Sequence, residues 1–185
     1  MISDVLKETR ERMNHSVLSL KDDLAVIRTG RASPALVEKL SVEYYGQPTP
    51  LIQLASISVP EPRQLLIKPF DPGSLKEIER AIQSSDLGLT PNNDGKMIRL
   101  TLPQLTEERR KELVKVVHAR VEEAHVAVRN IRRDALKDIR EFKDEKLIGE
   151  DDEKRGEDEL QKLTDEFIKQ LDGIGAAKEK DVMEV

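Results

Sequence analysis

Hydrophobic residues near the start of the chain recur with the spacing of a helix. They stand three, four or seven positions apart, at Ile2, Leu6, Met13, Val17, Leu20, Leu24 and Ile27. This spacing places them on one face of a helix and leaves polar residues on the others. Gly30 follows, and glycine commonly ends a helix because it accepts the left-handed backbone conformation without strain. The pattern predicts one helix over residues 1–29.

The same rhythm returns at Thr106 and predicts a long helix to Leu147, with Gly149 as its stop. A third helix is predicted after the acidic run that opens at Glu150. Three glycines interrupt this third helix, and each destabilises a helix by about 1 kcal/mol relative to alanine. The glycines are Gly156, Gly173 and Gly175. We therefore expect the last turns of the third helix to fray. Three amphipathic helices with one apolar face each predict a three-helix bundle.

The segment from 31 to 105 has a different sequence pattern, because it holds all nine prolines and short runs of β-branched residues. Four strands are predicted at 38–45, 53–59, 63–68 and 96–102, with turns at 46–48, 60–62 and 94–95. One helix is predicted over 75–84, with Ser74 as its N-cap and Glu77 three residues later. Strands on both sides of a lone helix indicate a small α/β domain.

This segment is an insertion between the first two long helices, so two chain crossings join the parts. The predicted fold class is α+β: an elongated three-helix bundle (1–30 and 106–185) with an inserted small α/β domain (31–105). Because both crossings lie side by side, we expect a hinge and a bent molecule. The predicted hinge residues are Gly30, Arg31, Ala32, Ser33, Pro103, Gln104, Leu105 and Thr106.

Composition narrows the classes of protein that fit. The 185 residues include no Cys and no Trp, with three Phe and two Tyr. Without cysteine there is no disulfide, thiol nucleophile or Cys-ligated metal, which fits a reducing compartment. No apolar run approaches the roughly 20 residues of a membrane-spanning helix, and no signal-peptide pattern opens the chain. We expect a soluble, cytoplasmic protein with no membrane partner.

Charge is distributed unevenly along a chain whose net charge is −5. Residues 106–148 carry 12 basic and 10 acidic side chains, net +2, whereas residues 149–185 carry 6 and 13, net −7. A basic segment inside an acidic protein can mark a surface for an anionic partner. Ordinary solvated helix faces explain the same counts equally well.

A stripe of basic residues on the predicted long helix favours the anionic partner. Nine positions fall on one face, about 110° from the apolar seam: His118, Glu122, His125, Arg129, Arg132, Arg133, Leu136, Arg140 and Lys143. Acidic residues of this segment collect on the opposite polar face, as at Glu123, Asp134 and Glu141. Such segregation is typical of a surface that tracks phosphates, and arginine makes bidentate contacts to them. Because the stripe contains no aromatic residue for base stacking, we expect folded RNA read by backbone and shape.

Catalytic and metal sites find little support. His118, Glu122 and His125 share a helix face and could geometrically hold a metal, but metal sites usually recruit ligands from more than one element. Neither a phosphate-binding glycine loop with its lysine nor a G-x-S-x-G element occurs. We expect no enzyme activity, no metal and no cofactor. Tyr44 and Tyr45 are assigned to packing in the small domain.

Several longer motifs, spread in order over the whole chain, closely resemble the bacterial ribosome recycling factors. They are Arg28-Thr29-Gly30-Arg31-Ala32-Ser33-Pro34, Glu43-Tyr44-Tyr45-Gly46 with Pro50 and Gln53-Leu54-Ala55-Ser56, Ser85-Asp86-Leu87-Gly88, Leu105-Thr106-Glu107-Glu108-Arg109-Arg110-Lys111 and Val128-Arg129-Asn130-Ile131-Arg132-Arg133-Asp134.

The resemblance implies an L-shaped molecule with the outline of a transfer RNA. Proteins of that family bind the post-termination ribosome across the aminoacyl and peptidyl sites. With elongation factor G and its GTP hydrolysis, they split the subunits and release the mRNA; they are not enzymes themselves. By the same resemblance, Arg129, Arg132 and Arg133 contact large-subunit ribosomal RNA, and Arg28 and Arg31 match arginines that flank the hinge. Arg140 joins these predicted RNA-binding residues through its place in the stripe.

A different class of protein remains as the alternative. The heptad-like seams would also suit a helical adaptor or coiled-coil structural protein without RNA binding. Such a coiled coil would dimerise, whereas seams that satisfy one another within one chain predict a monomer.

Overall fold

The computed structural model describes residues 1–184, which form two compact units. One unit combines Met1–Arg28 with Glu107–Glu184, and the other spans Thr29–Thr106. The first is all helical and the second holds every strand in the described part of the chain. The predicted α+β fold class, with long helices and a small sheet-containing part, is confirmed.

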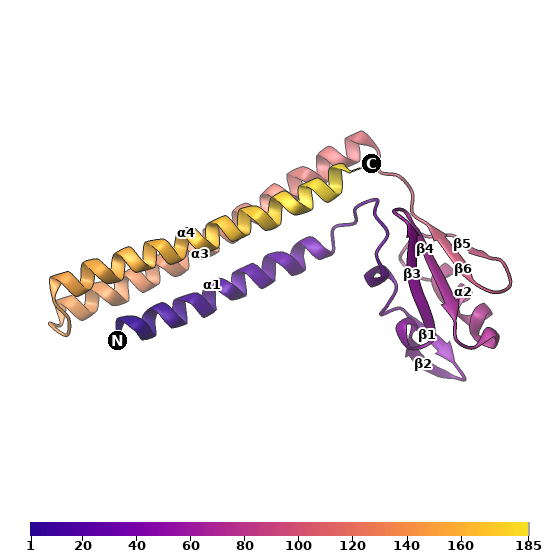
Figure 1. Ribbon diagram of the computed structural model, residues 1–185, viewed down its shortest axis with the longest axis horizontal. Helices are drawn as coiled ribbons and strands as arrows, with labels where there is room; N and C mark the ends of the chain where they lie inside the picture. Colours follow the sequence, from indigo (N-terminus) through magenta and orange to yellow (C-terminus); the bar gives the residue numbers. More distant parts are fainter. Residues whose placement is uncertain (185) are drawn as a thin grey trace. The chain divides into compact units, whose positions relative to one another are not determined.

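Three long helices pack along one another in the first unit (Figure 1): α1 (Ile2–Ala25), α3 (Glu107–Asp144) and α4 (Glu150–Met183). Their apolar seams meet in a continuous aliphatic core. Its fully buried residues include Met13, Val17, Leu20, Val117, Val128, Ile139, Leu160 and Leu171. These are seam positions that the helical spacing predicts.

The glycines expected to end the first two long helices do not do so. Helix α1 ends at Ala25, several residues before Gly30, and the backbone of Gly30 does not have a positive φ. Helix α3 ends at Asp144, and the residue with positive φ just beyond it is Lys146, at 60°. Gly149 is instead the extended residue that begins α4.

The expected fraying of α4 is also wrong, because the helix is continuous to Met183. Two of its glycines lie where another helix passes close by. A Cβ built on Gly175 would lie 2.5 Å from Cγ2 of Val121 on α3, and one on Gly156 would lie 3.2 Å from Cγ2 of Ile2 on α1. Gly173 has no such neighbour. Close packing of helices therefore accounts for two of the three glycines.

The small unit contains a four-stranded antiparallel sheet in the order β3-β4-β6-β5, formed by β3 (Ala55–Glu61), β4 (Gln64–Pro69), β5 (Pro91–Asn93) and β6 (Ile98–Thr101). A separate hairpin pairs β1 (Ser41–Tyr44) with β2 (Gln47–Pro50). Register places Leu65 opposite Leu100 and Ile67 opposite Ile98, all four fully buried. These cross-strand pairs form the centre of a core that the helix and the hairpin also join.

Helix α2 (Leu75–Gln83) occurs where it is predicted and buries Leu75, Ile78 and Ile82. Ser74 is its N-cap residue, as predicted, but the Ser74 side chain makes no capping hydrogen bond to α2. The Ser74 hydroxyl donates to the backbone oxygen of Asp71 at 2.7 Å, and the Asp71 carboxylate accepts from the backbone N–H of Gly73 at 2.9 Å. A short 3₁₀ turn, Pro72–Ser74, therefore precedes α2 and takes Asp71 as its cap.

Candidate nucleic-acid interface

Helix α3 is unbroken from Glu107 to Asp144, so the predicted basic stripe does lie on one helix face. Its arginines differ in exposure. Arg129, Arg133 and Arg140 are exposed, whereas Arg132 and His125 are half-buried. These side chains also differ in what they contact.

Most of the stripe faces polar side chains of α4. The cross-helix distances are 3.0 Å from His118 Nε2 to Glu179 Oε2, 2.7 Å from His125 Nε2 to Asp172 Oδ1, 3.4 Å from Arg132 Nη1 to Gln161 Oε1, 3.1 Å from Arg140 Nε to Glu157 Oε1 and 3.1 Å from Lys143 Nζ to Glu153 Oε2. The hydrogen bond and charge of Glu153 raise the pKa of Lys143. The acidic residues of the segment 149–185 thus neutralise basic side chains of α3. Part of the stripe therefore holds α3 against α4.

Arg133 differs from the rest of the stripe. It is exposed and makes no hydrogen bond or ion pair with any residue between 1 and 184. Arg129 makes only a long contact, 3.5 Å from Glu122. Ion pairs at such exposed positions contribute about 0–1 kcal/mol, so exchanging them for a phosphate costs little. Arg129 and Arg133 are therefore the part of the stripe best placed to bind an anion, whereas Arg132 is half-buried and contacts Gln161 of α4.

Arg28 and Arg31 lie on either side of the boundary between the two units. Arg28 is the last residue of the first segment of the helical unit, Arg31 belongs to the small unit, and both are exposed. Beyond Arg31 the chain is fixed to the small unit, because the Ala32 N–H donates to the Pro62 oxygen at 2.7 Å. On the return crossing, the Leu102 N–H donates to the Arg63 oxygen at 2.8 Å.

The histidines of the stripe do not converge on one point. His118 contacts Glu179, whereas His125 contacts Asp172 and lies 3.4 Å from Glu122. Among residues 1–184, no group of three or more His, Cys, Asp or Glu side chains could hold a metal ion. Within that same range, no helix is both long and apolar enough to cross a membrane.

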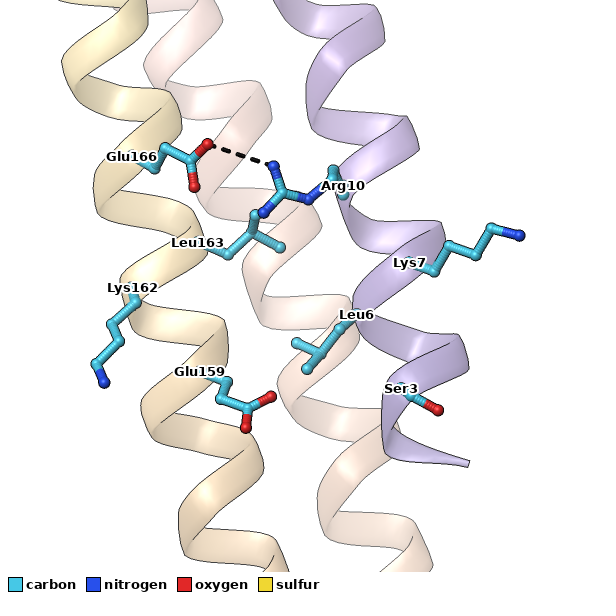
Figure 2. Close-up of a pocket in the computed structure, with 8 residues that line it drawn as sticks. All are labelled: Ser3, Leu6, Lys7, Arg10, Glu159, Lys162, Leu163 and Glu166. Atoms are coloured by element: carbon cyan, nitrogen blue, oxygen red, sulfur yellow. Dashed lines mark hydrogen bonds and ion pairs between the residues drawn. The ribbon is translucent and has the colours of Figure 1, made fainter.

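A groove lies between α1 and α4 in the helical unit (Figure 2). It has a volume of about 430 Å³, and Leu6 and Leu163 line it. Arg10 Nη1 lies 3.3 Å from Glu166 Oε1 across the groove, while Lys7 and Lys162 point away from it. The ion pair across it identifies the groove as part of the junction between the two helices.

Sequence reasoning missed a second polar site, in the small unit. The hydroxyls of Tyr44 and Tyr45 lie 3.2 and 3.5 Å from Asp71 Oδ2. Tyr44 is half-buried and packs against the core, as expected, but Tyr45 is 85% exposed. Strand alternation and the glycine that follows Tyr45 were the available signals, since they place Tyr45 at the tip of a hairpin.

An all-helical unit with an inserted antiparallel sheet unit defines a class of two-unit α+β protein, and its longest helix, α3, carries exposed arginines. Comparison with known proteins identifies the member of that class. The ribosome recycling factor family matches residues 20–183, and the chain belongs to this family.

Relatives match along their full length. The chain is 57% identical to the ribosome-recycling factors of Roseiflexus castenholzii and of Syntrophomonas wolfei, over all of each chain. A solution structure of a ribosome recycling factor is similar with a TM-score of 0.77, at 46% identity over 100% of this chain and 98% of that one. Models of the T. thermophilus factor, bound with E. coli elongation factor G to the E. coli post-termination complex, give a TM-score of 0.66 at 46% identity over 100% of both chains.

Proposed function

We propose that this chain binds the ribosome after termination and, with elongation factor G, separates the subunits so that the mRNA is released. The observation that carries this is similarity over the full length to recycling factors, one of them placed with elongation factor G on a post-termination complex. Nothing in the described bundle favours the adaptor alternative, since its seams are buried against one another within one chain.

The anchor in this proposal is the outward face of α3. Arg129, Arg132 and Arg133 bind phosphates of large-subunit ribosomal RNA, and Arg140 contributes further along the same helix. Arg28 and Arg31, which lie outside α3, make additional contacts with RNA. The guanidinium groups suit this task because they remain charged and bind phosphate oxygens in pairs. Weak ion pairs with α4 hold the neighbouring cationic side chains in place until RNA phosphates replace the α4 carboxylates as their partners.

The small unit moves relative to the anchored bundle in this proposal. The joints are the two predicted crossings, 30–33 and 103–106, which absorb the change in backbone angles. Because the Ala32 N–H is bonded to Pro62, the first crossing flexes at Gly30 and Arg31. The energy comes from GTP hydrolysis by elongation factor G, and the chain itself carries out no catalysis. It acts as a monomer in the cytoplasm.

Arg133→Ala tests the anchor most cleanly, because this side chain has no hydrogen-bond or ion-pair partner among residues 1–184 whose loss would disturb the fold. We expect ribosome affinity to fall about tenfold, the value of one charge-assisted contact. The salt dependence of binding should also become shallower, by close to one unit in the log–log slope. Both quantities come from ribosome-binding titrations at several salt concentrations.

Arg120→Ala is the matched control, since Arg120 is an exposed α3 arginine that pairs with Glu123 on the same helix. It should bind as the unchanged protein does. Equal affinities and slopes for the two variants would contradict the proposed anchor. GTP hydrolysis by the purified chain alone would contradict the proposal that elongation factor G carries out the hydrolysis.

A further inference from the structure

The small unit has a pocket that combines exposed aromatic rings with carboxylates. It has a volume of about 350 Å³, and its lining includes Glu43, Tyr44, Tyr45, Asp71 and Glu77. The rings of Tyr44 and Tyr45 meet edge to face with their centroids 4.6 Å apart. Phe70, next to Asp71 in the chain, is 69% exposed. Three of the five aromatic residues of the protein thus lie at or beside this one pocket.

The backbone holds Tyr45 in an unfavourable conformation. The turn between β1 and β2 consists of Tyr45 and Gly46, and their φ angles are 49° and 79°. Two positive φ angles are typical of the type I′ hairpin turn, in which Asn-Gly is the favoured pair. A bulky residue at the first position costs on the order of 1 kcal/mol or more. The turn places a large ring at the mouth of the pocket, where it touches Tyr44 edge to face and remains 85% exposed.

Hydrogen bonds fix the carboxylate at the centre of the pocket. Asp71 Oδ1 accepts from the Gly73 N–H at 2.9 Å, and Oδ2 faces both tyrosine hydroxyls. Partial burial, followed by the hydrogen bond to Asp71, raises the pKa of Tyr44. The Tyr44 hydroxyl therefore keeps its proton and donates a hydrogen bond to Asp71 Oδ2.

Charge decides what kind of ligand fits. The lining holds three carboxylates, Glu43, Asp71 and Glu77, and a single cation, Arg80, which pairs with Glu77 at 3.5 Å. Glu43 is exposed and makes no ion pair or hydrogen bond within residues 1–184. A net negative pocket repels phosphate, so it does not suit RNA. Carboxylates beside the face of an aromatic ring attract a cation. A planar guanidinium can stack on the ring and donate hydrogen bonds to the carboxylates at the same time.

We propose that this pocket binds an arginine side chain presented by a loop of a basic protein. The guanidinium stacks on the exposed ring of Tyr45 while its N–H groups donate to Asp71 and Glu43. The inference concerns the small unit alone and stands independently of the proposed RNA anchor on α3.

The test is an NMR titration of the full chain with the peptide acetyl-Gly-Arg-Gly-amide. The comparison peptide carries citrulline, whose neutral urea has the shape of the guanidinium without its charge. We expect saturable shifts of the Tyr45, Gly46 and Asp71 amides with the arginine peptide and none with the citrulline peptide. Equal shifts with both peptides would overturn the proposal.

Tyr45→Asn tests the ring without endangering the fold, because asparagine suits the left-handed backbone. We expect arginine-peptide affinity to drop about fivefold, the value of an exposed cation–π contact. Glu43→Gln should weaken binding as well, whereas Glu61→Gln, an exposed carboxylate outside the pocket, should leave it unchanged. Undiminished binding by Tyr45→Asn would contradict the proposal. So would saturable shifts of the same amides with oligouridylate, since they would show that the rings stack on bases.

Discussion

The helical unit and the small unit place their few aromatic residues in opposite ways. In the bundle, Phe167 is buried and Phe142 half-buried. In the small unit the core is aliphatic, while Tyr45 and Phe70 are exposed. The two surfaces therefore offer partners different chemistry. The bundle exposes guanidinium groups on α3, and the small unit exposes aromatic rings beside carboxylates.

The largest expected effect comes from testing whether the two units are stable independently. Leu100→Ala empties the centre of the small core, where Leu100 is fully buried opposite Leu65, and should cost that unit about 2–5 kcal/mol. Both tyrosines lie in the small unit and the protein has no Trp, so tyrosine fluorescence reports only on that unit. Far-UV circular dichroism reports mainly on the long helices of the bundle.

We expect the fluorescence transition of Leu100→Ala to move to lower temperature while the helical transition stays in place. Ile139→Ala, at a fully buried site in the bundle, is the matched control and should shift only the helical transition. A common shift of both transitions in either variant would show that the two units unfold together. The units would then differ in surface chemistry but not in independent stability.

The bundle was the more predictable unit, because its helices follow from spacing within single stretches of sequence. Its errors lie at the ends. Gly30 and Gly149 read as helix stops, but α3 ends through the positive φ of Lys146, and Gly149 begins α4. The small unit was harder, because β2 and β5 contain Pro48, Pro50 and Pro91 and were missed. Proline is tolerated in such strands because they lie at sheet edges, a position that only the pairing reveals.

The candidate site was predictable only in part. Helical spacing alone placed Arg129, Arg132 and Arg133 on one face, and their contact with RNA stays a prediction. The acids that neutralise the rest of the stripe lie on α4, so the register of two helices decides which cations remain available. That register depends on close contacts such as Gly175 against Val121, which no count of charges along the chain can supply.

A smaller effect is expected from the glycines of α4, which separate packing from helix propensity. Gly173→Ala meets open space and should stabilise the bundle by about 0.5–1 kcal/mol, since alanine favours the helix. Gly175→Ala gains the same propensity but drives a Cβ against stiff Val121, and overpacking costs about 1–3 kcal/mol. Thermal unfolding followed at 222 nm should therefore rise for the first variant and fall for the second. Equal shifts would show that α4 does not need a glycine to approach α3.

The smallest effect distinguishes the small unit by its response to acid. Asp94 lies in the turn between β5 and β6, where its Oδ1 accepts from the N–H groups of Lys96 and Met97, both at 2.9 Å. These two bonds lower the pKa of Asp94. A carboxyl whose pKa is lower in the folded state stabilises that state above its unfolded value of about 4, and this contribution disappears as the pH falls through the folded pKa. Asp94→Asn removes the titration, so the fluorescence transition of the small unit should lose part of its decline below about pH 4. The helical transition should decline with acid as before, and an unchanged pH profile of the small unit would show that the turn does not depend on the Asp94 charge.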